Sequence, residues 1–274
     1  MTEVPTVRAP ANGPGLGALW HALRSVRSPP EFEPLQWTSE LRVAPHLVAD
    51  VYLPSPPESA TGVPSAVRGT VVVVHGGAFL IGDRRMKPAR YFCTELTARG
   101  FRCVSLDYRL IFRGGRLTEA VADVVAGLRA AHVPGVPLYA LGLSAGASLT
   151  LLGAAQVPEV ERVVGAYGLW DFTCLSGRLA RLLPRLLCET ADVATWARRS
   201  PNAHRVEARA LLLHGTDDAL VPVGQAVALS ERRIAGGLHS ELVVVPGAPH
   251  GYFNHVTADT RAGLEAVCRF LEAP

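Results

Sequence analysis

Residues 142–146, Gly-Leu-Ser-Ala-Gly, lie between two apolar runs of different character. Residues 136–141 have the composition of a strand, and residues 147–152 have that of a helix. A serine with glycine two residues to each side is typical of a strained strand-to-helix turn, because a side chain at either glycine would crowd it. Ser144 is then expected beside the N-terminus of the helix. By itself the pentapeptide also fits an ordinary turn entering a helix, so its meaning depends on the rest of the chain.

Strand-like and helix-like segments alternate from residue 70 onward. The β-branched run 70–74 is expected of a strand that is buried on both faces. The alternation predicts an α/β fold with a mostly parallel central sheet and helices on both faces. The expected strands are residues 70–74, 101–106, 138–141, 163–169, 210–214 and 241–245, after an antiparallel pair at 41–43 and 47–53. The expected helices are residues 88–99, 117–131, 222–234 and 257–271.

The length of 274 residues fits a single α/β domain spanning residues 1–274. Residues 1–38 are rich in Pro and Gly and are expected to form an N-terminal extension with a short helix at 16–26. Residues 171–203 are longer than a crossover between two strands requires. Their leucines and arginines fall on different faces of a helix broken near Pro184. Because ligands bind at the carboxyl ends of such strands, we expect this insertion to form a small helical cap, with ordinary packing as the alternative.

The composition limits the partners and cofactors of the chain. The net charge is only +3, and no basic run alternates with aromatic residues, so nothing indicates nucleic-acid binding. No apolar run approaches the length of about 18 residues that indicates a membrane helix, and residues 1–14 lack the pattern of a signal peptide. The five cysteines show no zinc-type spacing, which indicates no metal site and favours reduced thiols in a cytoplasmic protein.

A glycine-rich segment, His-Gly-Gly-Ala-Phe at residues 75–79, directly follows the expected strand at 70–74. Its glycines let the backbone turn so that amide groups point into a site at the strand end, which is the pattern of an oxyanion loop. His75 is expected to hold this loop and not to act in catalysis. The expected oxyanion donors are the amides of Gly77, Ala78 and Ala145, with Gly76 as the alternative.

A serine nucleophile needs a base and an acid that orients the base, and both follow later strands. His250 lies in a Gly- and Pro-rich loop after the expected strand at 241–245, and the strand before it leads into Asp217 and Asp218. The chain order serine, aspartate, histidine is that of α/β-hydrolases. The sequence therefore predicts a catalytic triad of Ser144 as nucleophile, Asp218 as acid and His250 as base.

Other titratable residues lack this context. Asp107 also follows a strand, and we expect it to tie down a loop. The remaining histidines outside these motifs are expected at the surface or in the core, and they are His21, His46, His132, His204, His239 and His255.

The chain resembles the α/β-hydrolase carboxylesterases of the hormone-sensitive-lipase and BD-FAE (feruloyl/acetyl esterase) type. The resemblance is carried by residues 50–54, 75–79, 82–83, 107–110, 142–146, 200–201, 214–222 and 249–251. It implies an α/β-hydrolase fold and hydrolysis of small carboxylic esters through an acyl-enzyme, without a cofactor. In these esterases the acid directly precedes an x-Leu/Val-Val-Pro stretch, which implies Asp218 and not Asp217.

Some positions depart from the pattern of these esterases and leave the substrate open. Leu143 replaces a polar residue, Ala147 replaces a frequent glycine, and Ile-Phe-Arg at 111–113 replaces Ala-Pro-Glu. One alternative function is amide hydrolysis of the arylformamidase type, which shares the His-Gly-Gly loop. Another is a hydrolase-fold biosynthetic protein that binds a ligand or shapes a non-hydrolytic step, although the intact triad argues against it. The sequence does not indicate an oligomeric state.

Overall fold

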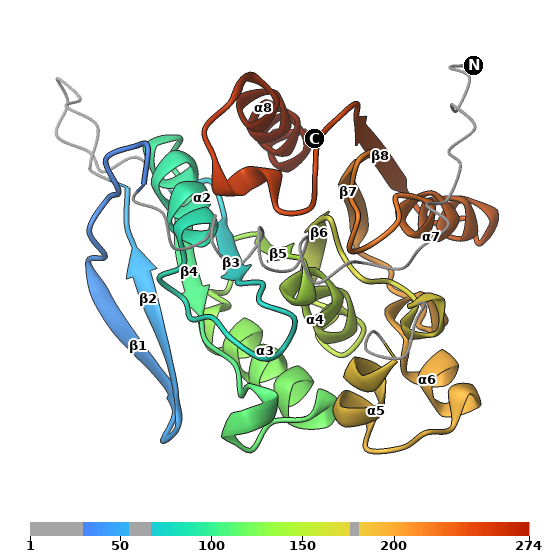
Figure 1. Cartoon of the computed structure of the whole chain (residues 1–274). Helices are drawn as coiled ribbons and strands as arrows, with labels where there is room; N and C mark the ends of the chain where they lie inside the picture. The colour runs from blue at the N-terminus through green and yellow to red at the C-terminus, as the bar shows by residue number, and fades with distance from the viewer. Residues whose placement is uncertain (1–29, 55–66, 176–180, 274) are drawn as a thin grey trace, which may run out of the picture.

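The structure, a computed structural model, describes residues 30–54, 67–175 and 181–273. Within these ranges the strands form an eight-stranded sheet in the order β1-β2-β4-β3-β5-β6-β7-β8 (Figure 1). All neighbours from β4 to β8 are parallel, whereas β2 is antiparallel to both β1 and β4. The strands are β1 Ser39–Ala44, β2 Leu47–Tyr52, β3 Thr70–Val74, β4 Arg102–Leu106, β5 Leu138–Leu143, β6 Val160–Ala166, β7 Arg209–Gly215 and β8 Ser240–Val245. The predicted mostly parallel sheet is confirmed.

Helices cover both faces of this sheet (Figure 1). In β3, Val72 and Val74 pack in one cluster with α3, α4 and α7, whereas Val71 and Val73 pack in the other with α2 and α8. The helices are α2 Lys87–Ala98, α3 Leu117–Ala131, α4 Ala145–Ala154, α5 Leu182–Cys188, α6 Val193–Arg199, α7 Gly224–Ala235 and α8 Ala258–Glu272. Short 3-10 turns are η1 Ile111–Arg113, η2 Phe172–Cys174, η3 Pro201–Ala203 and η4 Tyr252–Asn254.

Strand β6 begins and ends three residues earlier than the predicted range of 163–169. Arg162 stands inside the strand because its buried guanidinium donates to the carbonyl oxygens of Phe270 and Ala273 at the end of α8, a tertiary contact that no local pattern reveals. The chain leaves the sheet at Tyr167, where φ is 41°. The apolar run therefore continues past the end of the strand, and the prediction of its bounds was wrong for that reason.

The parallel arrangement brings the predicted functional segments to one edge of the sheet. The loop at 75–79 follows β3, Ser144 follows β5, Asp218 follows β7 and His250 follows β8. These strands are neighbours or near neighbours and run in the same direction, so their carboxyl ends meet at the same edge.

The N-terminal extension is described only from residue 30, so the predicted helix at 16–26 lies outside the described residues. Residues 30–38 lie along the domain: the Leu35 amide donates to Thr94 Oγ1 over 2.9 Å, and Glu31 accepts a hydrogen bond from His255 over 2.8 Å. None of the described helices is long and apolar enough to cross a membrane.

The insertion at 171–203 contains η2, α5, α6 and η3, and residues 176–180 lie outside the described part. Helix α5 begins two residues before Pro184, so the proline falls in the first turn, where it removes no intrahelical hydrogen bond. The insertion starts beside the loop at 75–79, because the ring of Phe172 meets the ring of Phe79 edge to face with centroids 6.4 Å apart. Five of its buried side chains join the core cluster of α3 and α4, and these are Phe172, Leu175, Leu187, Cys188 and Trp196.

Candidate active site

Ser144 occupies a sharp turn between β5 and α4, with φ of 53° and ψ of −118°. This conformation is rare for a residue with a side chain and indicates a strained, functional position. The turn is held by the Ser144 amide, which donates to the Ala166 carbonyl oxygen over 2.9 Å. A Cβ atom at Gly142 would collide with the backbone of Ala147, and one at Gly146 would collide with the Val74 carbonyl. Both glycines are therefore needed for the turn, as the sequence pattern indicates.

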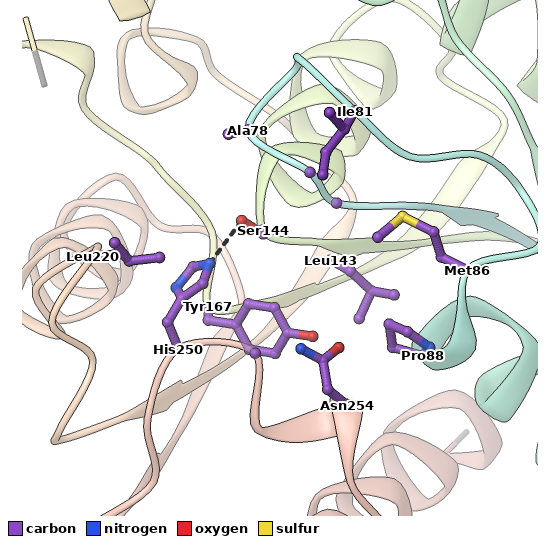
Figure 2. A pocket seen from close by; sticks show the side chains of 13 residues that line it. Ala78, Ile81, Met86, Pro88, Leu143, Ser144, Tyr167, Leu220, His250 and Asn254 are labelled. Carbon is purple, nitrogen blue, oxygen red and sulfur yellow. Dashed lines mark hydrogen bonds between the residues drawn. The ribbon is translucent and has the colours of Figure 1, made fainter. Parts of the chain in front are cut away.

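A chain of hydrogen bonds links the three predicted triad residues. Figure 2 shows its first link, from Ser144 to His250. Ser144 Oγ lies 2.9 Å from His250 Nε2, and His250 Nδ1 lies 2.7 Å from Asp218 Oδ2. Asp218 is buried, whereas Asp217 is exposed and accepts only from the neighbouring Thr216 hydroxyl among the side-chain contacts described. The structure thus brings Asp218, and not Asp217, to the imidazole.

The Asp218 carboxylate is held by four donors. Its Oδ1 accepts from the amides of Leu220 and Val221 over 2.9 and 2.8 Å, and its Oδ2 accepts from His250 and lies 3.0 Å from His214 Nε2. Burial would raise the pKa of this carboxyl, but the charge of His250 and the hydrogen bonds from His214 and His250 outweigh burial and lower the pKa well below its usual value. Asp218 is therefore anionic at neutral pH and can stabilise a protonated imidazole.

Sequence reasoning did not assign a role to His214. The available signal was its place at the end of β7, four residues before Asp218, where a side chain can turn back toward the loop.

The loop at 75–79 has an unusual backbone. Gly77, Ala78 and Phe79 have φ values of 107°, 53° and 62°. A Cβ atom at Gly77 would collide with the Ile81 carbonyl oxygen, because the Gly77 carbonyl in turn accepts from the Leu80 and Ile81 amides over 3.0 and 3.1 Å. Strain of this kind persists only where surrounding contacts maintain it, and it is concentrated at functional sites.

The predicted oxyanion donors lie around Ser144. Gly77 and Ala78 line the same pocket as Ser144, and Ala145 follows it at the start of α4. Among the described residues, none of these three amides donates a backbone hydrogen bond. They are accordingly available to an oxygen atom of a bound molecule, which is the requirement for an oxyanion hole.

Two residues expected to hold loops make contacts of that kind. His75 Nδ1 donates to the Gly76 carbonyl oxygen over 2.7 Å, and its ring stacks on Tyr108 with centroids 4.4 Å apart. Burial lowers the pKa of His75, which keeps the ring neutral. Asp107 accepts from the Arg84 amide over 2.7 Å and from its guanidinium over 2.5 Å, so it ties the segment after the loop at 75–79 to the end of β4.

The other histidines lie away from this chain of hydrogen bonds. His46, His239 and His255 each lie within 3.4 Å of a carboxylate, those of Asp123, Glu241 and Glu31 respectively. His21 lies outside the described residues. Among the residues that the structure describes, no group of three His, Cys, Asp or Glu side chains is placed to hold a metal ion.

A pocket opens beside Ser144 and His250 (Figure 2). Its lining is mainly apolar and includes Ile81, Met86, Pro88, Leu143, Tyr167 and Leu220, together with Asn254. The Tyr167 ring meets the His250 ring edge to face at a centroid distance of 5.1 Å. Sequence reasoning missed Tyr167, although its position directly after β6, at the same edge as the other loops, is a signal that could have found it.

The described lining contains no residue of the insertion, so a cap that closes on a ligand stays a prediction.

A mostly parallel sheet with a serine on a strained turn after β5, an aspartate-bearing loop after β7 and a histidine-bearing loop after β8 defines the α/β-hydrolase fold. The chain belongs to the BD-FAE family, which matches residues 49–232, more than half of its length.

Comparison with known proteins points to the same fold. The chain is 29% identical to esterase LipC of Mycobacterium tuberculosis over 240 residues, covering 76% of this chain and 59% of the relative. It is 30% identical to the probable carboxylic ester hydrolase LipM of the same organism over 183 residues, covering 56% of this chain and 42% of the relative. The chain therefore spans about half the length of these curated relatives.

Solved structures share the architecture at low sequence identity. The native thermophilic esterase Est2 of Thermogutta terrifontis superposes with a TM-score of 0.64 at 23% identity, covering 82% of this chain and 86% of that one. An inhibited esterase B from Lactobacillus rhamnosis superposes with a TM-score of 0.75 at 18% identity, covering 94% and 93%. At such identities the likeness shows the fold.

Proposed function

We propose that the protein is a serine esterase that hydrolyses small carboxylic esters through an acyl-enzyme. The observation that carries the proposal is the chain of hydrogen bonds from Ser144 through His250 to Asp218, with successive distances of 2.9 and 2.7 Å. It is the arrangement that a serine hydroxyl needs to lose its proton while it attacks a carbonyl carbon. Membership of the BD-FAE family and the names of the two mycobacterial relatives support the same activity.

In the acylation step, Ser144 Oγ attacks the ester carbonyl and His250 Nε2 takes the hydroxyl proton. The imidazolium that forms keeps its Nδ1 proton directed at Asp218, whose negative charge stabilises it. The tetrahedral oxyanion accepts hydrogen bonds from the amides of Gly77, Ala78 and Ala145. His250 then gives its proton to the leaving alcohol as the carbon–oxygen bond breaks.

In the deacylation step, a water molecule replaces the alcohol. His250 removes a proton from this water as it attacks the acyl carbonyl, and the same amides stabilise the second oxyanion. Collapse of the intermediate returns the proton to Ser144 Oγ and releases the carboxylic acid. Apart from the water molecule, the groups named in these two steps belong to the polypeptide or to the ester.

The pocket supports substrates with an uncharged, apolar acyl or alcohol group. Its described lining is dominated by aliphatic side chains and Met86, and it contains no Asp, Glu, Lys or Arg side chain. The cysteines support a reducing, cytoplasmic location, because all five are free thiols and all but Cys174 are buried.

A fluorophosphonate probe tests the nucleophile, and a panel of chromogenic esters tests the reaction. We expect the probe to label Ser144 and the esters to be hydrolysed faster than N-formylkynurenine, the substrate of the arylformamidase alternative. Faster turnover of N-formylkynurenine would favour amide hydrolysis. Failure of the probe to label Ser144 would favour a protein that only binds its ligand, and it would overturn the esterase proposal.

A further inference from the structure

His214 lies at the carboxyl end of β7 and has no solvent-exposed surface. Its Nε2 atom lies 2.8 Å from the Val221 carbonyl oxygen and 3.0 Å from Asp218 Oδ2. One imidazole nitrogen therefore contacts both the first and the last residue of the turn from Asp218 to Val221.

The contacts of His214 define its protonation state. A carbonyl oxygen can only accept a hydrogen bond, so the proton must lie on Nε2. Nδ1 is buried and has no hydrogen-bond partner among the described residues. A proton there would be a buried donor without an acceptor, which is costly. The ring is therefore neutral, with its Nε2–H shared between Val221 and Asp218.

This proton completes the shell of the Asp218 carboxylate. An ionised carboxylate offers about four acceptor sites. Two are used by the amides of Leu220 and Val221, one by His250 Nδ1–H and one by His214 Nε2–H. The loop amides hold Oδ1, and the two imidazoles hold Oδ2 between them. With all sites used, the carboxylate has no freedom to rotate away from His250.

We propose that His214 is a positioning residue of the triad, whose Nε2–H fixes Asp218 Oδ2 toward His250 and takes a share of its negative charge. This inference rests on the proposed esterase function. It predicts that His214 acts on turnover and not on substrate binding, because its side chain is absent from the pocket lining.

The titratable groups around Asp218 come from three elements. His214 approaches from β7, His250 from the loop after β8, and Tyr167 from the end of β6. Burial raises the pKa of Tyr167 well above its ordinary value, so its phenol stays neutral. His250 is then the group beside Asp218 that exchanges a proton in the proposed reaction. Loss of the His214 proton donor would leave more of the carboxylate charge for the protonated His250 and favour that form.

The test compares His214→Leu, which has similar bulk and no donor, with His214→Gln, whose amide can place an N–H near the position of Nε2. We expect His214→Leu to lower kcat by about tenfold to a hundredfold with KM unchanged, and to move the acid limb of kcat to higher pH by about half a unit or more. His214→Gln is expected to keep most of the wild-type kcat and most of the wild-type position of the acid limb. A lower kcat with an unmoved acid limb, no change in kcat, or a glutamine variant as impaired as the leucine variant would overturn the proposal.

A measurement on the wild-type protein decides the question if His214→Leu does not fold. Nitrogen-15 NMR of histidine-labelled protein, assigned with His214→Gln, is expected to show a neutral ring with its proton on Nε2, and a proton shift that follows the titration of His250. A His214 proton on Nδ1, or a proton chemical shift that does not change as His250 is protonated, would overturn the inference. Failure of the esterase proposal is distinguishable, because wild-type protein would then neither turn over esters nor react with the fluorophosphonate.

Discussion

The two sides of Ser144 are maintained by different physical means. On one side, side chains hold side chains: His250, Asp218 and His214 form a connected, mostly buried network in which the carboxylate has all its acceptor sites filled. On the other side, the loop at 75–79 presents backbone amides, and its form depends on positive φ angles and on the absence of a side chain at Gly77.

This difference predicts opposite sensitivities to mutation. In the network, removing a single atom or changing one acceptor to a donor should reduce turnover while the fold survives. In the loop, adding a single methyl group should do the damage, because no side-chain function is lost and only space and backbone conformation change.

The largest expected effect is that of Ser144→Ala, at the junction of the two sides. Removing the nucleophile should lower kcat by about 10⁶-fold, which is the scale for loss of a catalytic serine. The free energy of unfolding should stay within about 1 kcal/mol of wild type, because the hydroxyl is only half-buried and contributes little to stability. Ester hydrolysis assays and thermal melts measure the two quantities. Turnover that persists in the variant would end the serine-esterase interpretation.

Within the network, Asp218→Asn should cost about 10⁴-fold in kcat, as an amide in place of the carboxylate favours the wrong imidazole tautomer; this magnitude is the known value for the same change in a serine protease. Asp217→Asn serves as the matched control and should cost less than about tenfold, because its carboxylate is exposed and screened. Steady-state kinetics of the pair decides between them. If the Asp217 variant proves the more impaired, the assignment of the acid is off by one residue.

Within the loop, Gly77→Ala should lower kcat by about 100- to 1000-fold, which is the cost of losing one oxyanion donor. Gly237→Ala is the matched control: this glycine also has a positive φ, 74°, but its Cβ position is open. Both variants should lose stability through backbone strain of about 1–3 kcal/mol, and only Gly77→Ala should lose turnover. Comparable kcat values in the two variants would mean that the Gly77 amide does not contact the oxyanion.

Acidification separates the effect of His250 on turnover from the effect of Asp218 on stability. Turnover should fall by about tenfold per pH unit once His250 is protonated, because an imidazolium cannot act as a base. Asp218 cannot cause this loss: its folded pKa lies below the unfolded value of 3.8, so its contribution to stability is complete above pH 3.8 and is lost only as the pH falls further. Hydrolysis of an activated ester across the acid range measures the first effect. A flat profile would contradict a histidine base.

Acid unfolding measures the second effect. Below pH 3.8 the stability of wild type should decline more steeply than that of Asp218→Asn, because only wild type has this carboxylate to protonate. Equal slopes in the two proteins would show that the native contacts of Asp218 do not favour its ionised form.

The smallest expected effect concerns the insertion. Leu183 is half-buried against the core cluster and is absent from the described pocket lining. Leu183→Gln should therefore change KM for acetate and hexanoate esters alike, whereas lost contacts in an acyl pocket would discriminate between them by about tenfold or more. A selective rise in KM for hexanoate would favour the cap.

The parts of the molecule that could be predicted from sequence are those in which local chemistry dictates the structure. The strand at 70–74 is a continuous run of β-branched residues. The turn at Ser144 is marked by two glycines, at positions where a Cβ atom would collide with the backbone. The bounds of β6 could not be predicted, since Arg162 is satisfied by carbonyl groups at the far end of the chain. The role of His214 was missed because its position four residues before Asp218 indicates only proximity, and the contact of its Nε2 with the carboxylate appears only in the fold.

The backbone at Ser144 also restricts which nucleophiles this fold could evolve to use. At φ of 53° a second branch on Cβ is strongly disfavoured, so threonine would require the turn to be rebuilt. Cysteine has the same unbranched geometry as serine and would enter by a single substitution. The route from an oxygen to a sulfur nucleophile is therefore open at this position, whereas the route to a secondary alcohol is closed by the backbone conformation of Ser144.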